Sequence, residues 1–80
     1  MRYRLIDETK DYLGHTLHRI QYESGELGGW IEKEENLSGD AMVGDNAIVD
    51  DNAIVYGNAR VNGNARITGN ARITGNAIVD

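Results

Sequence analysis

The fold is decided by residues 39–80, which read GDAMVG, DNAIVD, DNAIVY, GNARVN, GNARIT, GNARIT and GNAIVD when divided into sixes. The hexads fill this segment without insertion, so the period is six. Each hexad has Ala at its third position and Val or Ile at its fifth, and a spacing of two places both side chains on one face of a strand. Gly-Asn or Asp-Asn marks a turn about every six residues, because Gly and Asn tolerate positive φ.

A period of six predicts a coiled chain of short strands. It fits no helical face, and each Gly costs about 1 kcal/mol relative to Ala in a helix. Identical corners bend the chain always the same way, and three corners close a coil of eighteen residues, so residue i stacks on residue i+18. We therefore expect an all-β fold, a single-stranded parallel β-helix with the Ala and aliphatic side chains inside.

The aliphatic series reaches back before the regular repeats. Ile31 and Leu37 precede Val43 at six-residue steps, so the solenoid is expected to span residues 27–80 in about three coils. Glu35 then falls on an inward position, where an unpaired Glu is rare. Either the first coil is open at that corner, or its first hexads are a looser lead-in.

Residues 1–26 are predicted to be a β-hairpin cap on the first coil, within one domain, because solenoids end in atypical repeats. Arg2–Ile6 and Thr16–Tyr22 have β-favouring residues and are separated by a polar stretch that ends in Leu13-Gly14. Ser24-Gly25 and Gly28-Gly29 are expected to be turns leading into the coils.

Several segments together resemble the YdcK-like hexapeptide-repeat proteins of bacteria and prophages. The segments are Tyr3-Arg4-Leu5, Asp7-Glu8-Thr9-Lys10, Thr16-Leu17-His18-Arg19-Ile20, Leu27-Gly28-Gly29-Trp30-Ile31-Glu32, Asn36-Leu37-Ser38 and the GNAxV hexads. The resemblance covers nearly the whole chain, although the stretch from Ile20 to Gly25 is short and the repeats stop early. It implies a left-handed β-helix and a phage context, and it implies no reaction. The handedness comes from this resemblance alone.

Composition excludes several classes of protein. The chain has no Cys, so a disulfide framework and a thiolate metal site are excluded. A net charge of -5 is the wrong sign for sequence-independent nucleic-acid binding. No apolar run approaches the roughly 18–20 residues of a membrane span, and Met1–Ile20 does not resemble a signal peptide. We expect a cytoplasmic location, in a bacterial cell or a phage-infected host.

The residues also disfavour an enzyme, and we expect no catalytic residue, cofactor or metal. Hexapeptide acyltransferases usually need a histidine base beside a pantetheine groove between subunits, whereas His15 and His18 both precede the coils. These two histidines lie three apart, on opposite faces of a strand, which is poor geometry for a metal site. The Asp residues of the hexads are expected to replace Gly or Asn in turns.

Arg60, Arg66 and Arg72 occupy the same hexad position and should form a belt around one coil, one on each face. Their stems are expected to cover outward apolar side chains, and Trp30 should stack on the same column as Arg66. The alternative is that the three arginines, with Trp30, bind an anionic ligand or an acidic partner.

Outward apolar side chains suggest a contact surface. These side chains are Trp30, Met42, Ile48, Ile54 and Ile78. We expect them to be covered by residues 1–26 or by another chain.

Three functions follow, in order of preference. The first is a non-enzymatic structural or interaction module of phage or prophage origin that acts through rigid faces and self-association. The second is a phage protein that inhibits a host factor or sequesters a small anionic signal, and the third is an acyl-CoA-dependent transferase.

The expected partner is a second copy, in a homodimer joined end to end through the C-terminal coil. The interface residues would be Ile73, Ala77, Ile78 and Val79, since an uncovered strand edge invites pairing. A lateral trimer on the outward Ile side chains is the alternative. We expect no membrane contact and no nucleic-acid partner.

Overall fold

The first position of each hexad turns the chain in the computed structural model, which describes residues 3–80. Backbone φ is positive at this position in every hexad, from 55° at Asp45 to 73° at Gly57. Asp45 and Asp51 take the place that Gly holds elsewhere, as predicted for the turns. The corners therefore follow the sequence period, because only residues that tolerate positive φ stand there.

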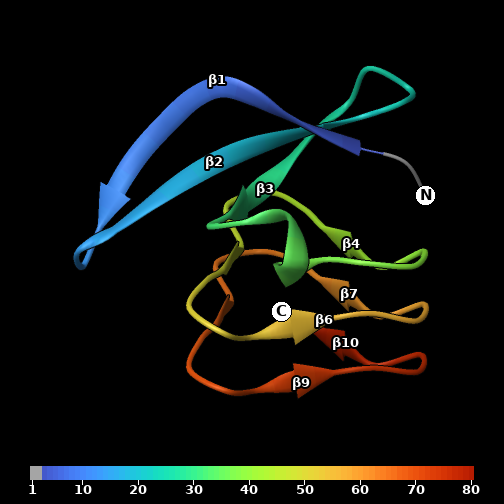
Figure 1. Ribbon diagram of the computed structural model, residues 1–80. Helices are drawn as coiled ribbons and strands as arrows, with labels where there is room; N and C mark the ends of the chain where they lie inside the picture. Colours follow the sequence, from blue (N-terminus) through green and yellow to red (C-terminus); the bar gives the residue numbers. More distant parts are fainter. Residues whose placement is uncertain (1–2) are drawn as a thin grey trace.

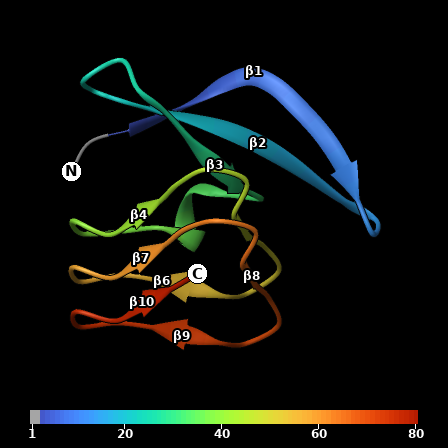
Figure 2. The same cartoon turned by 180° about the vertical axis from the view of Figure 1, so that it is seen from behind.

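Strands that lie eighteen residues apart in the sequence stack on one another and pair in parallel. β3 (Leu27–Ile31) pairs with β5 (Ile48–Val49), and β5 pairs with β8 (Arg66–Ile67), so that Trp30, Ile48 and Arg66 form one column. The other two faces repeat this arrangement. Their strands are β4 (Met42–Val43), β7 (Arg60–Val61) and β10 (Ile78–Val79) on one face, and β6 (Ile54–Val55) and β9 (Arg72–Ile73) on the other. Figures 1 and 2 show these stacked strands from opposite sides.

The inward assignment of the Ala and aliphatic positions is correct through most of the solenoid. Val43, Val49, Val55 and Val61 are fully buried, and the Ala side chains between them are buried as well. Each coil of eighteen residues forms one level of the solenoid, and the last level, which contains β8, β9 and β10, differs. Ala71 and Ala77 are exposed and Ile73 and Val79 are half-buried, because no further strand covers them among the described residues.

The N-terminal strands form a bent antiparallel hairpin over the first end of this core (Figure 1). β1 (Tyr3–Tyr12) is longer than the strand predicted for residues 2–6, because the polar stretch pairs with β2 (His15–Tyr22) down to Tyr12 opposite His15. The register shifts between Leu5 and Thr9, where β1 carries extra residues and bends. Arg2 lies outside the described residues.

The hairpin covers the core through β2. Ile20 and Tyr22 belong to the same buried cluster as Ile31 and Val43. The Tyr22 hydroxyl accepts a hydrogen bond from the Val43 amide at 2.7 Å and donates one to the Val43 carbonyl at 2.9 Å. The predicted boundary after residue 26 stays a prediction, since β3 pairs both with β2 of the hairpin and with β5 of the solenoid.

The prediction that Gly28-Gly29 form a turn is wrong. Both lie inside β3, and neither has a positive φ. A Cβ on Gly29 would lie 2.6 Å from the Ala47 carbonyl oxygen, and a Cβ on Gly28 would lie 2.7 Å from the Ile20 side chain. These glycines let β3 pass closely between the hairpin and the coils.

A single turn of 3-10 helix, η1 (Glu34–Asn36), resolves the question of Glu35. The turn directs Glu35 to solvent and places the fully buried Asn36 at the corner instead. Leu37 then rejoins the solenoid through a parallel bridge to Val55. The first coil is therefore irregular at this corner.

Within residues 3–80, no helix is long and apolar enough to cross a membrane.

Candidate functional site

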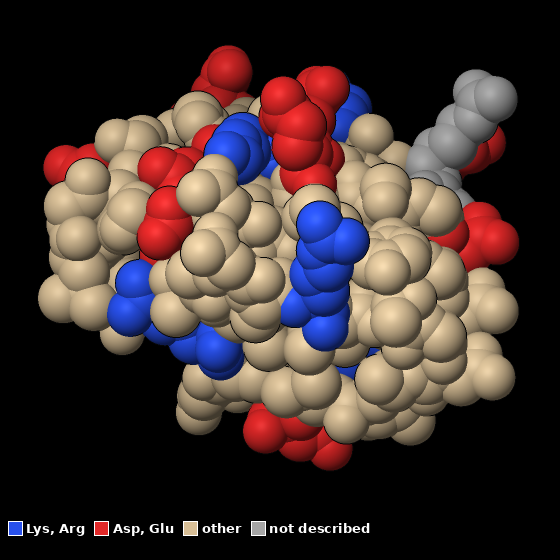
Figure 3. Space-filling view, turned by 60° about the horizontal axis from the view of Figure 1, so that its bottom comes forward, with Lys and Arg blue, Asp and Glu red and all other residues tan. Residues whose placement is uncertain are grey.

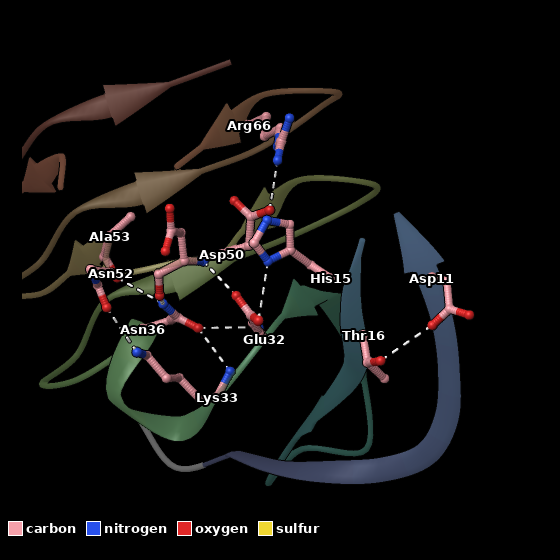
Figure 4. A network of polar contacts seen from close by, with 11 residues as sticks. Asp11, His15, Thr16, Glu32, Lys33, Asn36, Asp50, Asn52, Ala53 and Arg66 are labelled. Atoms are coloured by element: carbon pink, nitrogen blue, oxygen red, sulfur yellow. Dashed lines mark hydrogen bonds and ion pairs between the residues drawn. The ribbon is translucent and has the colours of Figure 1, made fainter. Parts of the chain in front are cut away.

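The hairpin and the solenoid meet in a network of polar side chains (Figure 4). His15, at the start of β2, faces Glu32, which follows β3, and His15 Nδ1 lies 3.1 Å from Glu32 Oε2. The other carboxylate oxygen, Glu32 Oε1, accepts a hydrogen bond from the Asp51 amide at 2.6 Å. Glu32 thereby ties the hairpin to the corner that follows β5.

An ion pair lies beside this contact. Arg66 Nη2 is 2.7 Å from Asp50 Oδ2, and the Asp50 side chain is fully buried. The Arg66 guanidinium also lies 4.9 Å from the centre of the Tyr12 ring. Asp50 Oδ1 and Arg66 Nε are buried without a protein partner. Asp50 is thus a buried carboxylate paired with a partly exposed arginine of the next coil, and not the simple turn residue that was expected.

The charges in the network support one another. The hydrogen bond that His15 donates to Glu32 raises the pKa of His15 above its ordinary value of 6.5, with further help from the negative charges of Asp50 and Asp51. The Asp51 amide and His15 together lower the pKa of Glu32 below its ordinary value of 4.5. The fold therefore favours the charged forms of both His15 and Glu32.

Trp30 lies under the hairpin. It is 5 % exposed and forms a buried cluster with Leu17 and Ile48. Lys10 Nζ lies 4.4 Å from the centre of the Trp30 ring, and Arg19 Cζ lies 5.4 Å from it. The predicted covering of outward apolar side chains by residues 1–26 is confirmed for Trp30 and Ile48. This burial removes Trp30 from the predicted ligand surface.

Arg60, Arg66 and Arg72 lie on three different sheets, one on each face as predicted. They therefore do not gather into a single cationic site, and Arg66 is paired with Asp50. In the view of Figure 3, basic side chains lie in separate groups between acidic and uncharged atoms.

Of the three arginines, Arg60 lines an open hollow of ≈ 710 Å³ on the sheet β10-β7-β4, and Arg66 and Arg72 do not. The hollow is also lined by Met42 and Ile78, and by the acidic residues Glu23 and Asp40. These carboxylates disfavour an anionic ligand there.

The residues predicted for self-association lie on the last strands that residues 3–80 contribute to the solenoid. Ile78 is 67 % exposed, Ala77 is exposed, and Ile73 and Val79 are half-buried. All of them belong to the last level, on β9, on β10 or at the corner between these strands.

The network of polar side chains between the hairpin and the solenoid is called the polar junction below. The sequence analysis did not identify three of its residues: Glu32, Asn36 and Asp50. Asp50 alone carried a usable signal. It stands at the sixth position of its hexad, sixteen residues before an arginine, where an eighteen-residue coil brings the two side chains close together.

The comparisons with known proteins concern the repeats. The YdcK β-solenoid repeat matches residues 53–67 and again residues 65–80. These residues run from the corner before β6 to the end of β10, and the chain therefore carries YdcK-type β-solenoid repeats. This agrees with the resemblance to YdcK-like proteins. No curated protein and no solved structure matched the chain.

Proposed function

We propose that this protein is a non-enzymatic structural or interaction module of phage or prophage origin, working in the cytoplasm through rigid faces and self-association. The YdcK-type repeats support a repeat module. One observation supports the interaction role: Ile78 on β10 is 67 % exposed, and within residues 3–80 this strand pairs only with β7.

The hydrogen-bond pattern explains why the other edge of β10 is open within residues 3–80. In the levels above, an amide donates to the carbonyl seventeen residues ahead, as Arg60 does to Ala77 at 2.9 Å and Asn62 to Val79 at 2.7 Å. The equivalent amides of Ile78 and Asp80 face the end of the solenoid, where the described residues place no further strand. Such an edge is a template for another strand.

The partner that we propose is a second copy, joined end to end about a two-fold axis. Of the three last strands, β8 and β9 carry outward Arg66 and Arg72, while β10 carries Ile78. Charged edge residues discourage strand pairing, so β10 is the favoured contact. A two-fold axis pairs β10 with its own copy in antiparallel fashion and closes the assembly.

Light scattering tests the dimer at roughly 100 µM, well above ordinary micromolar dissociation constants. We expect Val79→Lys to give a monomer and Ile54→Lys to leave the dimer intact, whereas a lateral trimer on the outward Ile side chains would respond in the opposite way. Ile48 is unsuitable for this control because it is 8 % exposed beneath the hairpin. A wild-type monomer under these conditions would contradict the proposal.

The finer description of the fold belongs to the same proposal: a left-handed β-helix of about three coils over residues 27–80. The resemblance to hexapeptide-repeat proteins supports the hand, and the eighteen-residue register supports the length of each coil. An experimental structure of the chain tests both.

A thermal-shift screen separates the other two functions from this one. The module predicts no shift with nucleotides or acyl-CoA. A shift of several degrees with nucleotides would favour the sequestering protein, and one with acyl-CoA would favour the transferase.

A further inference from the structure

The tip of the hairpin, residues 10–16, reaches beyond the strands that anchor it. The ladder between β1 and β2 continues to Tyr12 opposite His15, but the ladder between β2 and β3 ends at His18 opposite Ile31. Figure 1 shows this tip extending past the stacked strands. The tip is therefore held to the solenoid by side chains.

Each of these side-chain contacts involves a cationic group. His15 contacts Glu32, the Tyr12 ring lies against Arg66, and Lys10 lies over the Trp30 ring. Of these cations, only histidine changes its charge near neutral pH. Protonation of His15 is therefore the change near neutral pH that can alter how tightly the tip is held to the solenoid.

The groups around His15 favour its protonated form from several elements. Glu32 accepts its hydrogen bond directly, and Asp50 and Asp51 add negative charge from the corner after β5. Arg66 on β8 lies beyond Asp50 and is neutralised by it at 2.7 Å. On β1, the Asp11 carboxylate accepts a hydrogen bond from the Thr16 hydroxyl within the tip, at 3.2 Å.

We propose that the hairpin tip is a proton-operated latch, which protonated His15 closes onto Glu32 and which opens when His15 loses its proton. Opening moves Lys10 away from Trp30 and loosens the cover over the apolar cluster of Leu17, Trp30 and Ile48. The latch thereby couples pH to the exposure of an apolar surface on the solenoid.

The direction of the pH response follows from the two carriers of charge. The pKa of His15 is raised above 6.5, so its contribution is full below that pH and is lost as the pH rises through the pKa in the folded protein. The pKa of Glu32 is lowered below 4.5, so its contribution is present above that pH and is lost in stronger acid. The latch is tightest between these ordinary values.

NMR tests the latch in the full chain. The imidazole signals of His15 and His18 and the indole signal of Trp30, the single tryptophan, are followed from pH about 5 to about 9, a range that spans histidine titration. We expect the Trp30 signal to move with the midpoint of His15. Amide exchange of residues 10–16, corrected for the intrinsic effect of pH, should accelerate through the same midpoint, while core amides such as Val49 stay protected.

Variants assign the effect to His15. His15→Gln should abolish the pH dependence of the Trp30 signal, Glu32→Gln should lower the midpoint, and His18→Gln should leave the response unchanged. A His15 that titrates while Trp30 and the tip amides do not respond overturns the proposal, as does an unaltered response in His15→Gln.

Discussion

The side chain of Asn36 provides hydrogen-bond partners for the backbone groups at the irregular corner. Its Oδ1 accepts hydrogen bonds from the amides of Glu32 and Lys33, at 3.1 Å and 2.8 Å. Its Nδ2 donates to the carbonyls of Asp51 and Ala53, at 3.2 Å and 2.8 Å. These bonds link the first coil to the second at the point where the regular ladder is interrupted, and a carboxamide suits this place because it offers two N–H donors and an oxygen that accepts two bonds.

We expect Asn36→Leu to destabilise the fold by about 2 kcal/mol or more, because each buried polar group left without a partner costs about 1–3 kcal/mol. Urea denaturation measures the loss. Asn64→Leu is the control, since Asn64 is an exposed corner residue. Equal stability of the two variants would show that the bonds of Asn36 are replaced by water.

The pair of Asp50 and Arg66 leads to a second prediction. Arg66→Ala leaves the carboxylate of Asp50 buried without its partner, so the melting temperature should fall. Arg72→Ala removes an exposed arginine from the same hexad position and should leave the melting temperature nearly unchanged. The prediction is wrong if both variants melt together.

At the scale of elements, β3 is the strand that joins two kinds of sheet. It pairs antiparallel with β2 and parallel with β5. It can do so because Gly28 and Gly29 bring its backbone close to Ala47 and to the Val43 side chain. Sequence reasoning took these glycines for a turn, because Gly-Gly is a turn signal when the neighbouring layers are unknown.

Gly29→Ala should therefore destabilise the protein by roughly 1–3 kcal/mol, the usual cost of overpacking. Its Cβ would meet a backbone carbonyl at 2.6 Å, which cannot move without breaking the strand pairing. Gly44→Ala is the matched control, because a Cβ there meets only the end of the Asn62 side chain at 3.2 Å. Chemical denaturation of the two variants gives the comparison.

The repeating elements were the most predictable part of the chain. A period of six with Gly or Asp at each corner is sufficient for the strands, the inward positions and the register. The polar residues 7–12 could not be recognised as part of β1, because their strand pairing with β2 is supplied by the hairpin and not by their own hydrophobicity. The polar junction depends on which side chains the bent hairpin brings to the corner after β5, and this is a tertiary property.

Depth within the solenoid should govern tolerance to large residues. Ala53 is fully buried in the middle level, whereas Ala71 occupies the same hexad position in the last level and is exposed. Ala53→Leu should cost about 1–3 kcal/mol, and Ala71→Leu should cost much less. Thermal melts of both at low concentration, where the proposed dimer dissociates, test the difference.

At the scale of the whole molecule, the two ends of the solenoid differ. The first end is closed by Ile20 and Tyr22 of β2, which complete the core above Ile31 and Val43. Within residues 3–80, the other end exposes the side chains of β10 and of the corner before it. In the proposed dimer the uncovered end is paired with its own copy, whereas a solenoid uncovered at both ends could stack head to tail into fibres.

Removal of residues 1–26 should therefore change the mode of assembly. The remaining chain would expose Ile31 and Val43 at its first end, and the β3 edge that now pairs with β2 would be free. With edges open at both ends, head-to-tail stacking becomes possible, and we expect aggregates whose size grows with concentration. Light scattering with circular dichroism measures this, and Val79→Lys in the shortened chain should limit the growth by blocking the second edge. A soluble, monomeric 27–80 fragment with a full β signal would show that the hairpin is dispensable for closing the solenoid.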